Sequence, residues 1–61
     1  MTDIFEGDEV MITTGKLNSY YGNVVAIYHY QNKEDKALVR TLDEDNKETV
    51  RRYNLSNLIK A

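Results

Sequence analysis

The sequence predicts an all-β fold, a small five-stranded barrel with a short 3-10 turn before the last strand. Strand-forming residues occur in short bursts, turn residues separate the bursts, and the bursts recur at roughly ten to twelve residues, a spacing typical of small barrels and sandwiches. A closed barrel is favoured because it removes the exposed edges that would leave an open sheet of this size marginal. A helix would compete only at Lys33–Leu42, where the apolar residues lack the 3.6-residue period. We therefore expect one domain spanning residues 1–61.

The first half of the chain carries two predicted strands and the loop between them. In Asp8–Thr14, the apolar residues Val10 and Ile12 recur at every second position, the period of a half-buried strand. The segment 15–21 contains Gly, Asn and Ser and is expected to form a loop. The segment 22–30 is rich in Val, Ile and Tyr, which favour a second strand.

The second half follows the same alternation of strand and turn. A polar turn is expected at Gln31–Asp35, and a third strand at Lys36–Leu42. The segment Asp43–Lys47 predicts a solvated turn, because Asp and Asn tolerate the left-handed backbone conformation. The expected remaining elements are a fourth strand at Glu48–Tyr53, one helical turn at Asn54–Asn57 and a closing strand at Leu58–Lys60.

Composition argues against several classes of function. The chain has no cysteine, which rules out a disulfide framework and a thiolate metal site, and its single histidine gives no transition-metal set. The acidic run Asp43–Asp45 lacks the spacing of a calcium loop. No catalytic constellation can be argued around His29, so we expect a non-enzymatic protein without cofactor or metal. The absence of a long apolar run and of a signal-peptide pattern predicts a cytoplasmic protein without a membrane span.

Charge is distributed unevenly along the chain. Eight Lys and Arg against ten Asp and Glu give a net charge of −2. Acidic residues crowd the first ten positions and the Asp43–Lys47 turn, whereas the segment 10–32 has none and carries Lys16, His29 and four tyrosines. The molecule can therefore be acidic as a whole and still present one neutral-to-basic face that is rich in aromatics.

Two segments, Gly7–Lys16 and Tyr21–Ile27, together resemble the KOW motif of NusG-type transcription elongation factors and several ribosomal proteins. The matching positions are Gly15, Lys16, Gly22, Val24 and Ile27. The resemblance implies an SH3-like barrel. A residue without Cβ at position 22 would let the chain enter the second strand at a steep angle, and the step from Val24 to Ile27 predicts a bulge. Nucleic-acid-binding members usually carry more basic residues and another glycine where this chain has residues 18–20.

The resemblance implies a binding module that contacts RNA or DNA within a nucleoprotein machine such as RNA polymerase or the ribosome. Loop aromatics would stack on bases while Lys and Arg neutralise phosphates. The predicted contact residues are Lys16, Asn18, Tyr20, Tyr21, Arg40, Arg51 and Arg52. Neighbouring residues of a strand point to opposite faces, so at most one of the last two arginines is expected in the same patch.

Plainer interpretations of these residues stay open. One of the two loop tyrosines could instead cap an open end of the barrel, the cations could be ordinary solvated charges, and Tyr28 and Tyr30 are expected to pack on the sheet. The alternative function is a protein–protein interaction module or a small regulatory subunit of a larger complex, monomeric when isolated. In this respect Ser19–Gly22 and Leu55–Leu58 resemble small SH3-like subunits of photosynthetic electron-transfer complexes that dock ferredoxin. A structural accessory without a dedicated site is the third interpretation.

Overall fold

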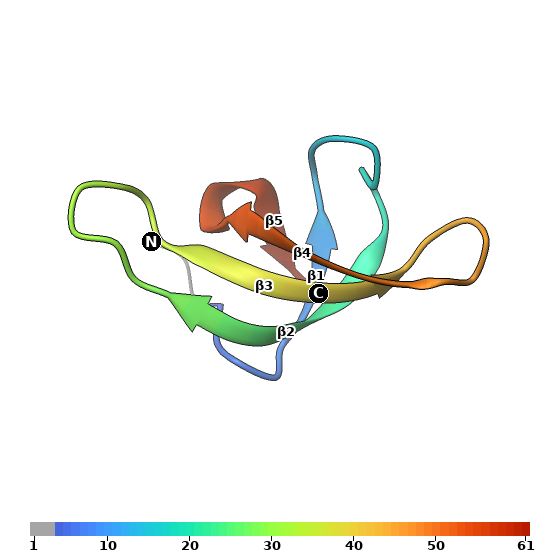
Figure 1. Cartoon of the computed structure of the whole chain (residues 1–61), viewed down its shortest axis with the longest axis horizontal. Coiled ribbons are helices and arrows are strands. Elements are labelled where there is room, and N and C mark those ends of the chain that lie inside the picture. The colour runs from blue at the N-terminus through green and yellow to red at the C-terminus, as the bar shows by residue number, and fades with distance from the viewer. Residues whose placement is uncertain (1–3) are drawn as a thin grey trace.

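A computed structural model describes residues 4–61 and confirms the predicted all-β fold. Five antiparallel strands form one sheet in the order β4-β3-β2-β1-β5, as Figure 1 shows. The elements are β1 (Glu9–Ile12), β2 (Tyr21–Tyr28), β3 (Lys36–Leu42), β4 (Glu48–Asn54), the 3-10 turn η1 (Leu55–Asn57) and β5 (Leu58–Lys60). Within residues 4–61, no helix has the length and apolar character needed to cross a membrane.

The third and fifth strands begin and end where the sequence predicts, and the other boundaries differ by a few residues. The largest differences are two residues each: β2 ends at Tyr28, and β1 ends at Ile12. Thr13 leaves the strand because its N–H and its hydroxyl both donate to the Asn57 carbonyl, each at 2.9 Å. The first strand is therefore fastened to the 3-10 turn that precedes the last strand.

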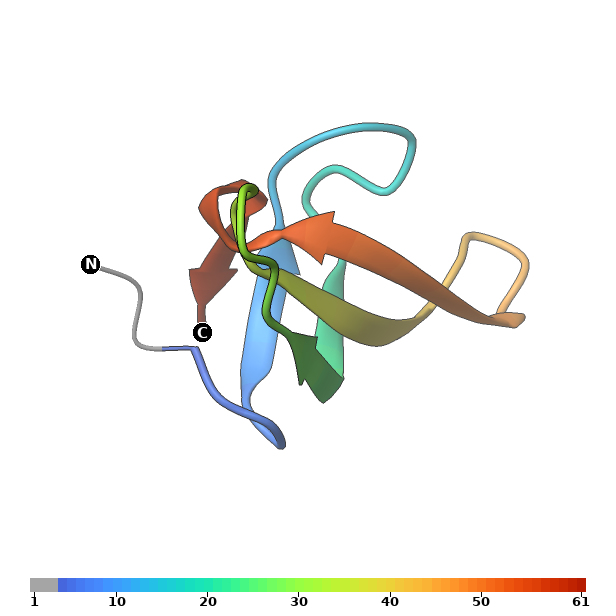
Figure 2. The same cartoon turned by 60° about the vertical axis from the view of Figure 1, so that its left-hand side comes forward.

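The sheet curls so that alternate residues of its strands enclose one apolar core (Figure 2). In β1, Val10 and Ile12 are fully buried, which confirms the predicted period of two. The edge strand β5 pairs with β1, with Leu58 opposite Ile12, so the end of the described chain completes the sheet. The buried apolar residues are Ile4, Val10, Ile12, Leu17, Val24, Ala37, Val39 and Leu58.

A bulge interrupts β2 at the predicted place. The pairing of β2 with β3 shifts between Val24 and Ala26, so Val25 has no partner in the register and is 41% exposed. The shift places Ile27, opposite the buried Ala37, against the core. The broken alternation in the sequence therefore reflects one extra residue in a bent strand.

Gly22 is required for a reason different from the expected one. Its φ is not positive, so the backbone there does not need the conformational freedom of glycine. Instead, a Cβ at this position would lie 2.7 Å from both the Arg40 carbonyl oxygen and Cγ1 of Val39. Glycine is needed because β3 passes too close to β2 for any side chain.

The loop between β1 and β2 contains two residues in the left-handed region, Gly15 (φ 76°) and Ser19 (φ 75°). Ser19 N–H donates to the Ile12 carbonyl at 2.7 Å, which fixes its backbone at the base of the loop. In the Asp43–Lys47 turn, Asn46 has φ 61°, which confirms the tolerance expected there.

Replacing Ser19 with glycine is expected to stabilise the fold by about 0.5–1 kcal/mol. A left-handed backbone costs a non-glycine residue about 1–2 kcal/mol, and glycine removes this cost. Part of the gain is lost because glycine has more conformational entropy in the unfolded chain. Urea unfolding followed by circular dichroism measures the change. Asn18→Gly is the matched control, because Asn18 is in the same loop without a positive φ. Equal stabilisation by both changes would contradict the role assigned to Ser19.

Gly22→Ala is expected to destabilise the fold by about 1–3 kcal/mol, the usual cost of forcing a carbon into a packed site. Rotation of a side chain cannot remove the clash, because one of the two contacts is a backbone oxygen. The same unfolding experiment tests the prediction, with Asn23→Ala as the exposed neighbouring control. A variant as stable as the parent would show that β3 can withdraw from β2.

Candidate binding surfaces

Six of the seven predicted contact residues separate into two hollows on the surface. Lys16, Arg51 and Arg52 line one, whereas Tyr20, Tyr21 and Arg40 line the other. Arg40 therefore lies beside the loop tyrosines, whereas the expected convergence of Lys16 and one of the two β4 arginines beside them is wrong. The separation follows from pairing register, which no local sequence pattern reports.

The first hollow, the cationic hollow, has a volume of about 500 Å³ and is lined by Gly15, Lys16, Arg51, Arg52 and Tyr53. Arg51 pairs with the buried Val39 and shares the inner face of the sheet, while Arg52 shares the outer face with its partner Leu38. The two arginines thus lie on opposite faces, as expected. Both nevertheless line the hollow, because β4 is an edge strand whose margin is accessible from either face.

Among the described residues 4–61, no carboxylate neutralises the cationic hollow. None of its lining residues is acidic. Within residues 4–61 the ion pairs are His29–Asp35 and Lys60–Asp8, so Lys16, Arg51 and Arg52 have no carboxylate oxygen within 4.0 Å in that part of the chain. Three unneutralised cations around one depression make it a place where an anion is attracted.

Aromatic rings accompany these cations, but they are not the rings of the loop. The Arg52 guanidinium lies over the Tyr28 ring, 5.1 Å from its centroid, and one of its nitrogens is 3.5 Å from the Tyr30 hydroxyl. Tyr53 lines the hollow and packs against the core. Sequence reasoning missed Tyr53, although its place two residues after Arg51 on a strand puts both on one face.

The second hollow, the aromatic–acidic hollow, has a volume of about 550 Å³. Its lining residues are Glu9, Tyr20, Tyr21, Gly22, Asn23, Arg40, Thr41, Leu42 and Glu48. Tyr20 is half-buried and packs against the core, whereas Tyr21 is 57% exposed. Asn18, the remaining predicted contact, is exposed in the loop and lines neither hollow.

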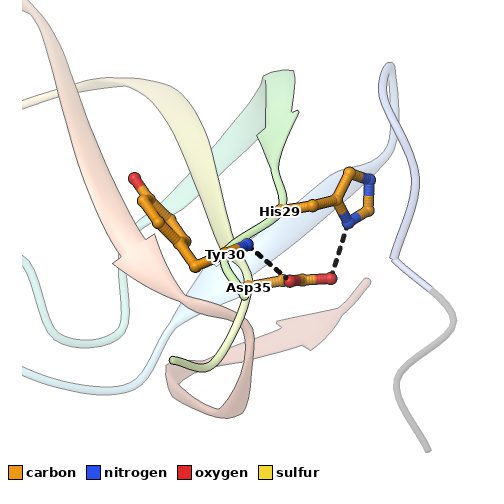
Figure 3. Close-up of polar contacts among 3 residues, drawn as sticks. All are labelled: His29, Tyr30 and Asp35. Carbon is orange, nitrogen blue, oxygen red and sulfur yellow. Dashed lines mark hydrogen bonds and ion pairs between the residues drawn. The ribbon is translucent and has the colours of Figure 1, made fainter. Parts of the chain in front are cut away.

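His29 has a partner that the sequence did not reveal. Its Nδ1 lies 2.7 Å from Oδ2 of Asp35, and the other oxygen of this carboxylate accepts the Tyr30 N–H at 3.3 Å (Figure 3). Asp35 also receives the Leu55 N–H at its backbone carbonyl, at 3.1 Å. The pair therefore closes the 29–35 hairpin and joins it to the start of η1.

A second contact joins the same hairpin to η1. The Glu34 carboxylate accepts the N–H of Ser56 at 2.6 Å and its hydroxyl at 3.0 Å. Together Glu34 and Asp35 hold the turn that carries the chain from β4 to β5. We refer to these contacts as the hairpin clamp.

Residues 4–61 contain no group of three or more His, Asp or Glu side chains arranged to hold a metal ion. Comparison of the chain with protein-family models, with curated proteins and with solved structures finds no match. The geometry of the two hollows is therefore the basis for the functional proposals.

The pKa of Asp35 lies below its usual value of 3.8, mainly because of the hydrogen bond to His29. The hydrogen bond from the Tyr30 N–H lowers this pKa further. We expect His29→Ala to return this pKa toward the usual value, measured by carbon NMR of the labelled carboxyl group.

Because the folded-state pKa is lowered, the stabilisation from Asp35 is complete above the unfolded-state pKa and is lost as pH falls through the folded-state value. Asp35→Asn should therefore make the free energy of unfolding fall less steeply with decreasing pH on the acid side, as urea unfolding at several pH values measures. An unchanged dependence on pH would show that the clamp does not couple to folding.

Proposed function

We propose that this chain is a non-enzymatic binding module that contacts nucleic acid, alone or within a nucleoprotein machine such as RNA polymerase or the ribosome. The contact surface is the Gly15–Gly22 loop together with the adjoining edge of β4. The observation that carries the proposal is the cationic hollow, where Lys16, Arg51 and Arg52 meet without a neighbouring carboxylate in residues 4–61. The resemblance of the loop to the KOW motif supports nucleic acid as the partner class.

Phosphate groups are the part of a nucleic acid that this surface suits best. Lys16 extends from the loop and Arg51 from the edge strand, so they approach the hollow from two sides. Arg52 is held by stacking on Tyr28, which leaves its outward N–H groups to donate to phosphate oxygens. Asn18, exposed in the same loop, can donate to a phosphate or to a base edge.

The expected affinity is low and strongly dependent on salt. With at most three phosphates neutralised, the logarithm of the association constant should fall with the logarithm of salt concentration with a slope of about −2 to −3. The net charge of −2 further weakens attraction at long range. Such a module would act as one of several contacts inside an assembly, where linkage raises its effective concentration.

The aromatic–acidic hollow contributes little to this function. Arg40 and Tyr21 share it with the carboxylates of Glu9 and Glu48, which repel a phosphate backbone. The predicted stacking of bases on the loop tyrosines is thus less favourable than contact at the cationic hollow. The exposed apolar side chains beside Tyr21 favour the alternative function, a protein–protein interaction module, for that part of the surface.

We assign the His29–Asp35 pair to loop architecture. The ring is 77% exposed, and within residues 4–61 its side-chain partner is Asp35, with no hydroxyl at hydrogen-bond distance. A carboxylate–histidine pair without a nucleophile does not make a hydrolytic site.

Fluorescent single- and double-stranded oligonucleotides, titrated with the protein at two salt concentrations, test the proposal. The double variant Lys16→Ala with Arg51→Ala should bind more weakly at low salt, and its salt slope should be smaller by about two, since each lost phosphate contact removes about one unit. Lys33→Ala with Lys47→Ala is the control, because it changes the net charge equally at exposed lysines outside both hollows.

Two results would contradict direct recognition of nucleic acid. One is the absence of binding by the parent chain at low salt. The other is an equal loss of affinity in the two double variants, which would mean that only net charge matters.

A further inference from the structure

We propose that the outer face of the sheet around Tyr21 and Leu42 binds a basic, amphipathic polypeptide segment. This surface shares no lining residue with the cationic hollow, so the proposal stands independently of nucleic-acid binding. It is carried by an exposed apolar row, an adjoining hollow and an acidic rim.

The apolar row crosses four strands. Ile59 of β5 pairs with Met11 of β1, and Met11 pairs with Tyr21 of β2. The neighbouring pair of Gly22 with Thr41 places Tyr21 beside Leu42 of β3. Directly paired residues project from the same face of a sheet, so these four side chains form one continuous row.

The row faces solvent and is not part of the core. Tyr21, Leu42 and Ile59 are 57%, 55% and 54% exposed, and Met11 is half-buried. Thr41 and Leu58, which precede Leu42 and Ile59 on their strands, are buried. Val50 pairs with Arg40 on the same outer face and is 47% exposed. Exposed apolar residues that occur singly are ordinary, but a connected set on one face of a domain this small marks an interaction surface.

Carboxylates lie at one end of the row and along one of its sides. Glu48 pairs with Leu42, and Glu9 precedes Met11 on the same face, two residues along β1. Both line the aromatic–acidic hollow, in which Arg40 is the single cation. The Asp43–Lys47 turn, with exposed Glu44 and Asp45, begins directly after Leu42. The rim is therefore acidic at that end and along that side.

This charge pattern selects among possible occupants. A second copy of the chain would bring two acidic rims together, which costs free energy. A phosphate backbone or an anionic lipid surface would be repelled by Glu9 and Glu48 for the same reason. A segment that has leucine-like side chains on one face and flanking Lys or Arg side chains matches both the row and the rim.

The two surfaces lie on different parts of the sheet and can be occupied together. The cationic hollow lies where the Gly15–Gly22 loop meets the β4 edge, whereas the row runs across β5, β1, β2 and β3. A domain with both would join a nucleic acid to a basic protein segment, a combination suited to a nucleoprotein assembly.

Amide NMR of the nitrogen-labelled protein tests the proposal with two synthetic helix-forming peptides. One has Leu on one face and Lys on the other, and the second has Glu in place of every Lys. We expect saturable shifts with the Lys peptide at Met11, Tyr21, Leu42 and Ile59, and weaker binding of the Glu peptide. The double variant Tyr21→Ser with Leu42→Ser should bind the Lys peptide about tenfold more weakly, or more weakly still. The matched control is Lys16→Ala with Arg51→Ala, which should bind that peptide at least as well as the parent.

A charge-reversed variant makes the test sharper. Glu9→Lys with Glu48→Lys changes exposed residues of the rim and should reverse the preference toward the Glu peptide. The proposal is overturned if neither peptide gives saturable shifts, if the shifts map onto Lys16 and Arg51, or if reversal of the rim leaves the preference unchanged. Concentration-dependent shifts of the row in the free protein would identify a second copy as the occupant and overturn it as well.

Discussion

The contact between β2 and β3 at Gly22 is the constraint on which the rest of the structure depends. Gly22 of β2 pairs with Val10 of β1 on one side and with Thr41 of β3 on the other, so three strands lie side by side at this residue. The Thr41 hydroxyl donates to the Tyr21 carbonyl and holds β3 against the start of β2. Because Gly22 has no side chain, β3 can approach β2 this closely, and the alternate residues of the curled sheet face either the core or the outer side.

Much of the fold follows from local patterns in the sequence, and the reasons are physical. The alternation at Val10 and Ile12 reports a strand with one buried face, and the step from Val24 to Ile27 reports a bulge. Asn46 occupies the left-handed turn position that its side chain tolerates. These features depend on neighbours along the chain, which is the information that a single sequence carries.

The composition of the binding surfaces could not be predicted in the same way. Whether Arg51 lies beside Lys16 or beside Tyr21 depends on how the curled sheet places the 15–21 loop against β4, and these two segments are distant in sequence. The Tyr28–Arg52 stack depends on the pairing of β3 with both β2 and β4, and the His29–Asp35 pair depends on the conformation of the 29–35 turn. The net charge of −2 does not reveal how charge is distributed over the surface. One hollow has no carboxylate in its lining, whereas the apolar row adjoins a hollow lined by Glu9 and Glu48.

The pairing of β1 with β5 has a consequence for how the molecule is made. Val10 pairs with Lys60, and the Lys60 ammonium lies 3.6 Å from the Asp8 carboxylate, so the beginning and end of the described chain are held together. Contacts between residues so far apart in sequence form slowly, because the intervening chain must be ordered first. During translation, the sheet cannot be completed until residues 58–60 have left the ribosomal tunnel. Until then β1 lacks its β5 partner, and Val10 and Ile12 lack the part of their packing that Leu58 supplies.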